Sequence, residues 1–321
     1  MAAFIIRRLA WALFVTFIIT VLVFLLFFRT PGIDPARQMA GRNPDPQTIA
    51  AIRHAFGLDR PLPIQYALMM KRLFISRDLI SYQYHNKVIP EIVSAAPITF
   101  SLVIGAALLW VVGGILIGVA AAVLRGTIID PLLMIIALIG ISVPVFWLGE
   151  VANLVTQDRL HDSVFSWVPP LGYVPLVDNP WQWFLHLVIP WFVLSVLYIG
   201  FYARVLRANL IETEGEDYVR TARAKGISEQ RVMFRHTLRT SMITFVSLFG
   251  LDFGVLVAGS TLLVEVVFNL HGIGYLTYNS LTRLDLPVIM ATVIYGAIFI
   301  VMANAVVDIL YARLDPRVRP T

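Results

Sequence analysis

The sequence predicts an all-α polytopic membrane protein with six transmembrane helices. Hydrophobic residues make up 58% of the 321 residues, charged residues only 14%, and the mean hydropathy is +0.79. A soluble domain carries about 25% charged residues, so this composition is not that of a soluble protein. Six apolar runs approach the roughly 20 helical residues that a bilayer core requires. We assign the spans to about residues 9–28, 97–124, 131–156, 183–203, 241–264 and 288–311.

Individual spans carry further signals. The first follows two arginines, as a signal peptide would, but it is too long and no small-residue cleavage site follows, so we interpret it as a retained span. The second begins at Pro97, because proline is tolerated in a first helical turn. Gly114 and Gly118 within it have the spacing that allows close helix packing. Pro144 and Pro190 predict bends in the third and fourth spans.

The distribution of basic residues predicts the orientation of the chain. With the N-terminus inside, the inside segments hold 14 Lys and Arg residues, whereas the two short outside loops hold only Arg159 and Arg283. The other nine of the 25 lie in the outside segment 29–96, which is too long for the charge rule to apply. Basic residues collect on the cytoplasmic side of membrane proteins, which also explains the net charge of +5 without nucleic-acid binding. We therefore expect both termini to be cytoplasmic.

The long segment 29–96 is expected to form an ordered extracytoplasmic cap. Asp45 and Pro46 have the pattern of a helix N-cap and first turn, and Gly57 is suited to end that helix. A second amphipathic helix is expected from Leu62 to Phe74. Such helices either lie on the membrane surface or pack on the outer mouth of the bundle, and the sequence leaves both arrangements open.

The stretch EDYVRTARAKGISEQRVMFRHTLR, residues 216–239, is a polar, basic insert in the inside loop 208–240. It predicts two short helices separated by Gly226, which would adopt the left-handed conformation after the first. Ser228 is a suitable N-cap for the second helix. One interpretation is that the arginines only contact anionic lipid headgroups. The first helix favours another interpretation, in which a stiff helix–glycine–helix element docks into a groove of a second protein.

Two carboxylates within predicted spans are candidates for a transport pathway. Asp252 lies in the middle of the fifth span between Gly250 and Gly254. It would either attract substrate amino groups in the pathway or form a structural hydrogen bond to a neighbouring helix, and the sequence leaves both open. Glu150 lies near the outer end of the third span, where a position reaching toward interfacial water is favoured over a pathway role.

Several kinds of chemistry have no basis in the sequence. The chain has no cysteine, which excludes disulfides and thiolate metal sites, and its six histidines show no metal-ligand spacing. No GxxxxGK[ST] phosphate-binding loop occurs, so any ATP hydrolysis must come from partner subunits. Gly140-Ile-Ser142 begins like a Gly-x-Ser protease motif, but Val143 replaces the second glycine. We expect Ser142 to be a helix-bending residue.

Five separated motifs carry a family resemblance. They are FGLDRPLPIQY (56–66), PITFSL (97–102), EDYVRTARAKGIS (216–228), EVVFNLHGIGYL (265–276) and LDPRVRP (314–320). Together and in this order they resemble the permease subunits of bacterial ATP-binding-cassette (ABC) importers of the dipeptide, oligopeptide and nickel group. The chain departs from the broader family pattern where Arg220, Thr221 and Ala222 replace Glu-Ala-Ala and where His271 replaces proline.

The resemblance implies a type I ABC importer permease fold in the bacterial inner membrane. It implies as partners a second homologous permease, two ATPase subunits that bind ATP and Mg, an extracytoplasmic substrate-binding protein and a peptide substrate, with nickel or haem left open. This chain itself would bind no cofactor. The alternative is a secondary transporter or channel without an ATPase. By resemblance the insert is an ATPase-coupling helix, with the contacts Glu216, Asp217, Tyr218, Val219, Ala222, Lys225 and Gly226.

Overall fold

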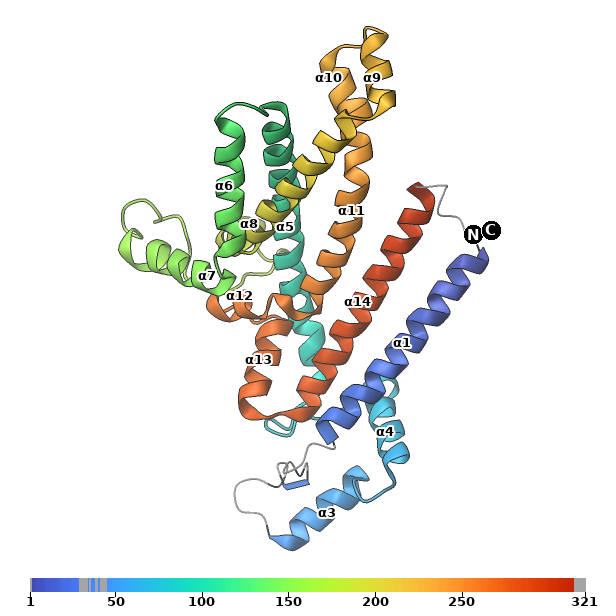
Figure 1. The fold of residues 1–321 in the computed structure, drawn as a ribbon. Helices are drawn as coiled ribbons and strands as arrows, with labels where there is room; N and C mark the ends of the chain where they lie inside the picture. The colour runs from blue at the N-terminus through green and yellow to red at the C-terminus, as the bar shows by residue number, and fades with distance from the viewer. Residues whose placement is uncertain (1, 29–33, 35, 38–39, 41–44, 315–321) are drawn as a thin grey trace. The chain divides into compact units, whose positions relative to one another are not determined.

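The computed structural model describes residues 2–28, 34, 36–37, 40 and 45–314 (Figure 1). The described residues are predominantly helical, and their one β-type pairing is an isolated bridge between Ile80 and Lys87. The chain divides into two compact units. Unit 1 comprises residues 1–99, 254–266 and 271–321, and unit 2 comprises residues 100–253 and 267–270. The C-terminal motif at 314–320 lies almost entirely outside the described residues.

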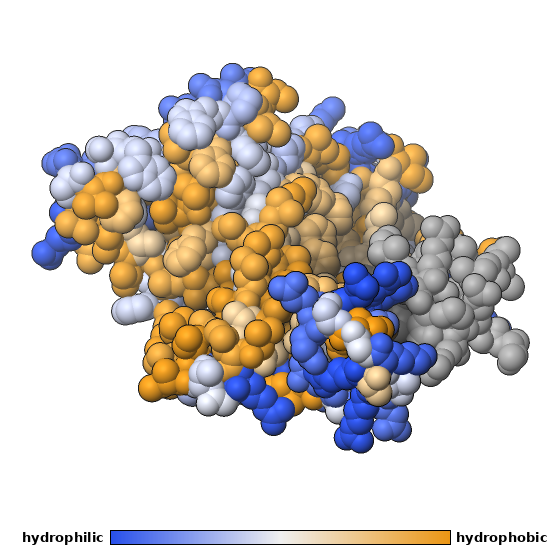
Figure 2. All heavy atoms as spheres, turned by 90° about the horizontal axis from the view of Figure 1, so that it is seen from above, coloured by the Kyte–Doolittle hydropathy of each residue, from blue (hydrophilic) through white to orange (hydrophobic). Residues whose placement is uncertain are grey.

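The all-α membrane fold predicted from the sequence is confirmed. Five of the described helices are long and apolar enough to cross a membrane, and the number is six when a bent pair of helices is counted as one span. Large apolar side chains are exposed on them, such as Leu13 at 73% and Ile136 at 60%, and apolar residues cover a broad area in Figure 2. Surfaces of this kind face lipid or protein rather than water. The five long helices are α1 (Ala2–Phe28), α5 (Val88–Val123), α8 (Pro180–Glu214), α11 (Leu238–Val255) and α14 (Leu286–Leu314).

The segment predicted as the third span, residues 131–156, is not a single helix. Its two arms meet at an angle of 94°. Val143 at the break is extended, because the residue before a proline is disfavoured in the helical region. Ser142 Oγ donates a hydrogen bond to the Leu138 carbonyl at 2.8 Å, the helix-bending contact expected for this serine. The arms are α6 (Ile129–Ser142) and α7 (Val145–Asn153), which continues as the π-helical η2 (Leu154–Arg159).

The helix that contains the second span begins earlier than predicted. It starts at Val88 rather than at Pro97, which lies inside the helix. The added turns are amphipathic, with Ile89, Ile92 and Ala95 buried in the core of unit 1. Burial of this face stabilises the helix ahead of the proline, where the sequence has too few consecutive apolar residues to be recognised as part of a span.

Close packing at the two spaced glycines is confirmed. A Cβ atom at Gly114 would lie 2.9 Å from Tyr202 Cβ, and one at Gly118 would lie 2.9 Å from the Ala203 carbonyl oxygen. Both contacts are with α8, so only glycine allows α5 and α8 to approach this closely within unit 2.

The two helices predicted within segment 29–96 are present. α3 (Pro46–Phe56) has Asp45 as its N-cap, which accepts a hydrogen bond from the Thr48 backbone N–H at 3.1 Å, and ends at Gly57 with φ of 68°. The hydrogen bonds from Thr48 lower the pKa of Asp45 below its usual value. The second predicted helix appears as α4 (Leu62–Met70) and the π-helical η1 (Lys71–Ile75).

The second of these helices packs into the core of unit 1. Met69 and Leu73 are buried in a cluster with Phe24 of α1 and Ile92 of α5. Tyr66 adds a hydrogen bond to Thr20 of α1, with 2.7 Å between the hydroxyl oxygens. α1 in turn runs along α14, as Figure 1 shows.

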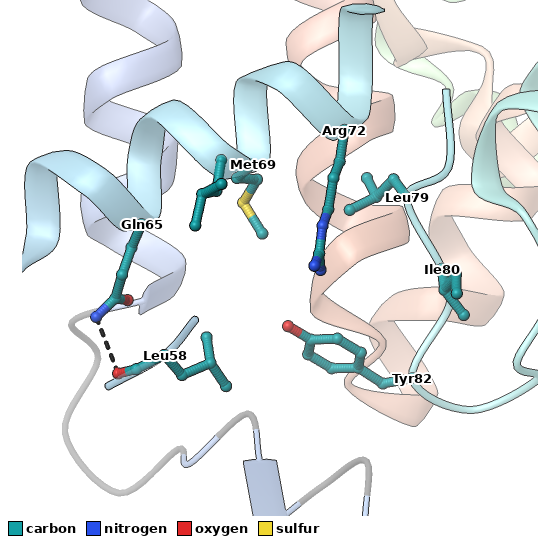
Figure 3. Close-up of a pocket in the computed structure, with 8 residues that line it drawn as sticks. Leu58, Gln65, Met69, Arg72, Leu79, Ile80 and Tyr82 are labelled. Carbon is teal, nitrogen blue, oxygen red and sulfur yellow. Dashed lines mark hydrogen bonds between the residues drawn. The ribbon is translucent and has the colours of Figure 1, made fainter. Parts of the chain in front are cut away.

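A small pocket lies beside α4 and η1 in unit 1 (Figure 3). Arg72 and the Tyr82 hydroxyl point toward one another across it, and Gln65 Nε2 donates to the Leu58 carbonyl at 3.0 Å. Burial raises the pKa of the Tyr82 phenol. The volume of the pocket is about 30 Å³, enough for about one water molecule, so it has no room for a transported solute.

The helix predicted as the fifth span ends before residue 264. The helical stretch is assigned from Glu229 to Ser260, and its helical geometry is broken at Gly259, whose φ of 131° would strain any residue with a side chain. Two shorter helices follow, α12 (Leu262–Val267) and α13 (Ile273–Arg283).

Candidate functional site

The polar insert, defined here as residues 216–237, folds as short helices at the end of two long ones. α9 (Asp217–Ala224) follows α8, and α10 (Glu229–Arg231) with the π-helical η3 (Val232–Thr237) leads into α11 (Figure 1). Gly226 has a φ of 75°, the predicted left-handed conformation. Ser228 stands at the predicted N-cap position, but its side chain makes no capping hydrogen bond.

A small apolar core holds the polar insert together. Val219 and Val232 are fully buried and Ala222 is 6% exposed, with Ile227 packed against them. Val219 and Ala222, expected as docking contacts, therefore point into the insert and fix α9 against η3. Their small size allows the two helices to approach closely, so Val219 and Ala222 pack inside the insert and do not form its outer face.

The exposed side of α9 is charged and aromatic. The Asp217 side chain is 99% exposed and Tyr218 is 43% exposed, while Glu216, Lys225 and Gly226 are exposed as well. Asp217 Oδ1 lies 3.7 Å from Arg220 Nη1, an exposed pair that contributes little to stability. Five of the seven predicted contact residues thus lie on an accessible surface.

Hydroxyl groups join the polar insert to α11, and α11 to α8. Tyr218 donates a hydrogen bond to Thr240 Oγ1 at 3.0 Å, which links α9 to α11. Thr213 and Ser241 share a buried hydrogen bond of 3.1 Å between α8 and α11. These bonds connect α9 to α11 and α11 to α8.

An ion pair that sequence reasoning missed joins α6 to α8. Arg207 Nε and Nη2 each donate to one carboxylate oxygen of Asp130, and both distances are 2.6 Å. Asp130 is 6% exposed, and two parallel bonds of this kind fix the orientation of both side chains. The sequence feature that could have indicated Asp130 is its position immediately before Pro131, at the start of an apolar run.

The two candidate pathway carboxylates differ in their surroundings. Asp252 Oδ2 accepts a hydrogen bond from the hydroxyl of Tyr202 at 2.7 Å. Tyr202 is fully buried, with the rings of Trp110 and Phe245 beside it. This bond favours the structural interpretation of Asp252. Glu150 is exposed on α7 and has no ion-pair partner among the described residues, which fits a position reaching toward water.

A second missed carboxylate, Glu265 of α12, is fully buried. Its oxygens accept hydrogen bonds from Thr99 Oγ1 at 2.7 Å, Thr261 Oγ1 at 2.9 Å and the Tyr275 backbone N–H at 2.9 Å. Burial raises the pKa of Glu265, and these hydrogen bonds oppose that rise. The carboxylate caps the first turn of α13, which otherwise lacks a side-chain cap. The sequence feature that could have indicated Glu265 is its position as a lone Glu within the apolar run LLVEVVF.

Comparison with known proteins identifies the family. Residues 114–320 match the model of the binding-protein-dependent transport system inner membrane component, and residues 1–103 match the model of the N-terminal part of such membrane components. The chain belongs to this family. It is accordingly a multi-pass inner-membrane component of an ABC importer rather than an enzyme, and importers of this family work with further subunits such as an ATPase and a binding protein.

Relatives within the binding-protein-dependent transport family are similar along their whole length. A Brucella abortus protein named for a peptide transport system permease is 37% identical over 322 residues, with 99% of each chain covered. The glutathione transport system permease proteins GsiC of Escherichia coli (strain K12) and Salmonella typhimurium (strain LT2) are each 38% identical over 320 residues, again with 99% of each chain covered.

Proposed function

We propose that this chain is a permease subunit that imports peptides and that its polar insert couples it to a separate ATPase. The similarity to permeases named for peptide and glutathione transport, over 99% of each chain, carries the substrate assignment. Glutathione is itself a small peptide, so both names describe the same class of solute. The implied partners are a second homologous permease, two ATPase subunits and an extracytoplasmic binding protein.

The coupling role is supported by the construction of the polar insert. A rigid element needs an internal core, and Val219, Ala222 and Val232 supply it. A docking element also needs an accessible face, and Asp217 and Tyr218 provide charge and an aromatic ring there. The hydrogen bond from Tyr218 to Thr240 of α11 gives motion of the insert a route into the helix that contains the predicted fifth span. Under this proposal Val219 and Ala222 hold α9, and Glu216, Asp217, Tyr218, Lys225 and Gly226 face the ATPase.

The proposed orientation has both termini and the polar insert in the cytoplasm. Its support is the concentration of basic residues in the segments joined to that side. Segment 29–96 and the residues around α12 and α13 would then face outward, where the binding protein delivers peptide. Asp252 is assigned a structural role through Tyr202, and Glu150 an interfacial one.

Purification of the complex through a tag on this chain tests the proposal. ATPase subunits should co-purify, and proteoliposomes supplied with the binding protein should accumulate short peptides only when ATP is present. The double variant Asp217→Lys/Lys225→Glu, which reverses two exposed charges and leaves the core of the insert intact, should insert normally but lose peptide-stimulated ATP hydrolysis. Uptake that continues without any ATPase would identify a secondary transporter, and coupled hydrolysis in the double variant would remove the coupling role from the insert.

A further inference from the structure

Two segments that the sequence predicts to be extracytoplasmic meet in one cleft of unit 1. The cleft has a volume of about 270 Å³ and lies between the turn before α5, the first turns of α5 and the N-terminal half of α13. Its polar walls come from Tyr84, Glu91, Ser94, His271, Tyr275 and Asn279, and Ala95, Leu276 and Val288 supply apolar contacts.

Glu91 gives the cleft its charge. It is the one carboxylate among the lining residues, which include no Lys or Arg. Asn86 Nδ2 donates to one of its oxygens. In the part of the chain that the structure describes, no Lys or Arg lies within ion-pair distance of the other oxygen. Arg283 lies over the ring of Tyr84, 5.0 Å from its centroid, and does not pair with Glu91. The half-buried Glu91 carboxylate, which has no cationic partner among the described residues, therefore favours the binding of a cation from solution.

Other polar groups of the cleft are also available to a ligand. The hydroxyls of Tyr84 and Tyr275 and the side-chain amide of Asn279 make no hydrogen bond with any described residue. His271 packs against Tyr275, with ring centroids 4.4 Å apart. A few convergent polar groups beside apolar contacts are typical of small-molecule sites.

The framework of the cleft is held by buried hydrogen bonds. Asp285, which is 1% exposed, accepts from Ser81 Oγ and from the Tyr82 backbone N–H, the latter at 3.1 Å. Ser81 Oγ in turn accepts from the Tyr84 backbone N–H at 2.9 Å. On the opposite wall Glu265 caps α13. The polar groups are therefore held in position before a ligand arrives.

We propose that this cleft binds the amino-terminal end of an incoming peptide, with Glu91 as the counterion of its α-ammonium group. The Asn279 amide and the Tyr275 hydroxyl are available to the first peptide unit, and Leu276 and Val288 to a small side chain. The volume is slightly below the roughly 300–1,000 Å³ of complete ligand sites, so the cleft holds one end of the peptide. This assignment rests on the proposed function, which makes peptide the solute and this side the outer one.

Thiol protection tests the site directly. Because the chain has no cysteine, Ser94→Cys introduces its one thiol at the exposed rim of the cleft. The assembled transporter without its binding protein is treated with a maleimide, and modification of this chain is followed by mass spectrometry. Trialanine should slow the modification, whereas N-acetyl-trialanine, which has no ammonium group, should not. Glu91→Gln in the Ser94→Cys background should raise the half-protecting concentration of trialanine about tenfold, the loss expected for one hydrogen bond to a charged group.

A matched control variant and three contrary outcomes complete the thiol-protection test. Asp78→Asn removes an exposed carboxylate of the same segment that does not line the cleft and should leave protection unchanged. Equal protection by both peptides, protection by 1,4-diaminobutane but not by trialanine, or no protection at all would each overturn the proposal. If the wild-type complex imports peptide while Ser94→Cys is unprotected, only the cleft assignment fails. If it imports no peptide, the proposed function fails first.

Discussion

The polar insert and the α12–α13 segment are both short connections between long helices, yet they are built in opposite ways. In the polar insert the charged side chains lie outside and three small apolar residues form the core. In the α12–α13 segment a carboxylate lies inside and Thr99, Thr261 and the Tyr275 N–H satisfy it. The first construction leaves its charged side chains exposed, whereas the second uses its charge to hold its own fold.

The largest effect should come from removing the buried carboxylate. Glu265→Ala leaves donors without an acceptor in a site that excludes water, at a cost of about 1–3 kcal/mol for each group. We expect a large fall in the melting temperature of the purified protein and a poor yield. The Glu265→Gln protein retains one acceptor oxygen, so its melting temperature should fall less. The Glu150→Ala protein loses only an exposed carboxylate, so its melting temperature should not fall at all. A Glu265→Ala protein that melts with the wild type would show that the carboxylate does not stabilise the α12–α13 segment.

A smaller, local effect should follow from a charge in the core of the polar insert. Val219→Asp buries a carboxylate at a fully buried position, so α9 should detach from η3 while the membrane helices stay folded. Trypsin should then cleave at the basic residues of the insert. Thr221→Asp adds the same charge on the exposed side of the same helix and should remain resistant. Equal resistance of the two variants would contradict the assigned core.

The smallest effect is expected at two helix N-cap positions, Asp45 and Ser228. Asp45 accepts a hydrogen bond from Thr48 N–H, whereas Ser228 makes no capping bond. Asp45→Ala should therefore increase amide hydrogen exchange in the first turn of α3, and Ser228→Ala should leave exchange in α10 unchanged. A faster exchange in α10 would indicate that Ser228 caps its helix in solution.

Features set by neighbouring residues could be predicted from the sequence, and features set by distant partners could not. Apolar run length located most membrane helices, and local turn chemistry identified Asp45, Gly57 and Gly226. The 94° break at Pro144 was foreseen only as a bend, because its size depends on the packing of both arms. The start of α5 was missed because burial by other helices extends it.

The same distinction applies to the functional site. The polar insert was recognised from its charges and its glycine, but the inward orientation of Val219 and Ala222 depends on Val232 in the next helix. Asp130 and Arg207 lie 77 residues apart, and Thr99 and Glu265 lie 166 apart. Neither separation has a spacing rule that a single sequence reveals.

Labelling of Lys225→Cys on the polar insert is the most direct test of the coupling proposal. Lys225 is exposed, and the chain has no other thiol to compete. In sealed membrane vesicles of known orientation, an impermeant maleimide should modify this cysteine only from the cytoplasmic side, and bound ATPase subunits should protect it. Modification from the opposite side, or an equal rate with and without the ATPase, would contradict the coupling role of the polar insert.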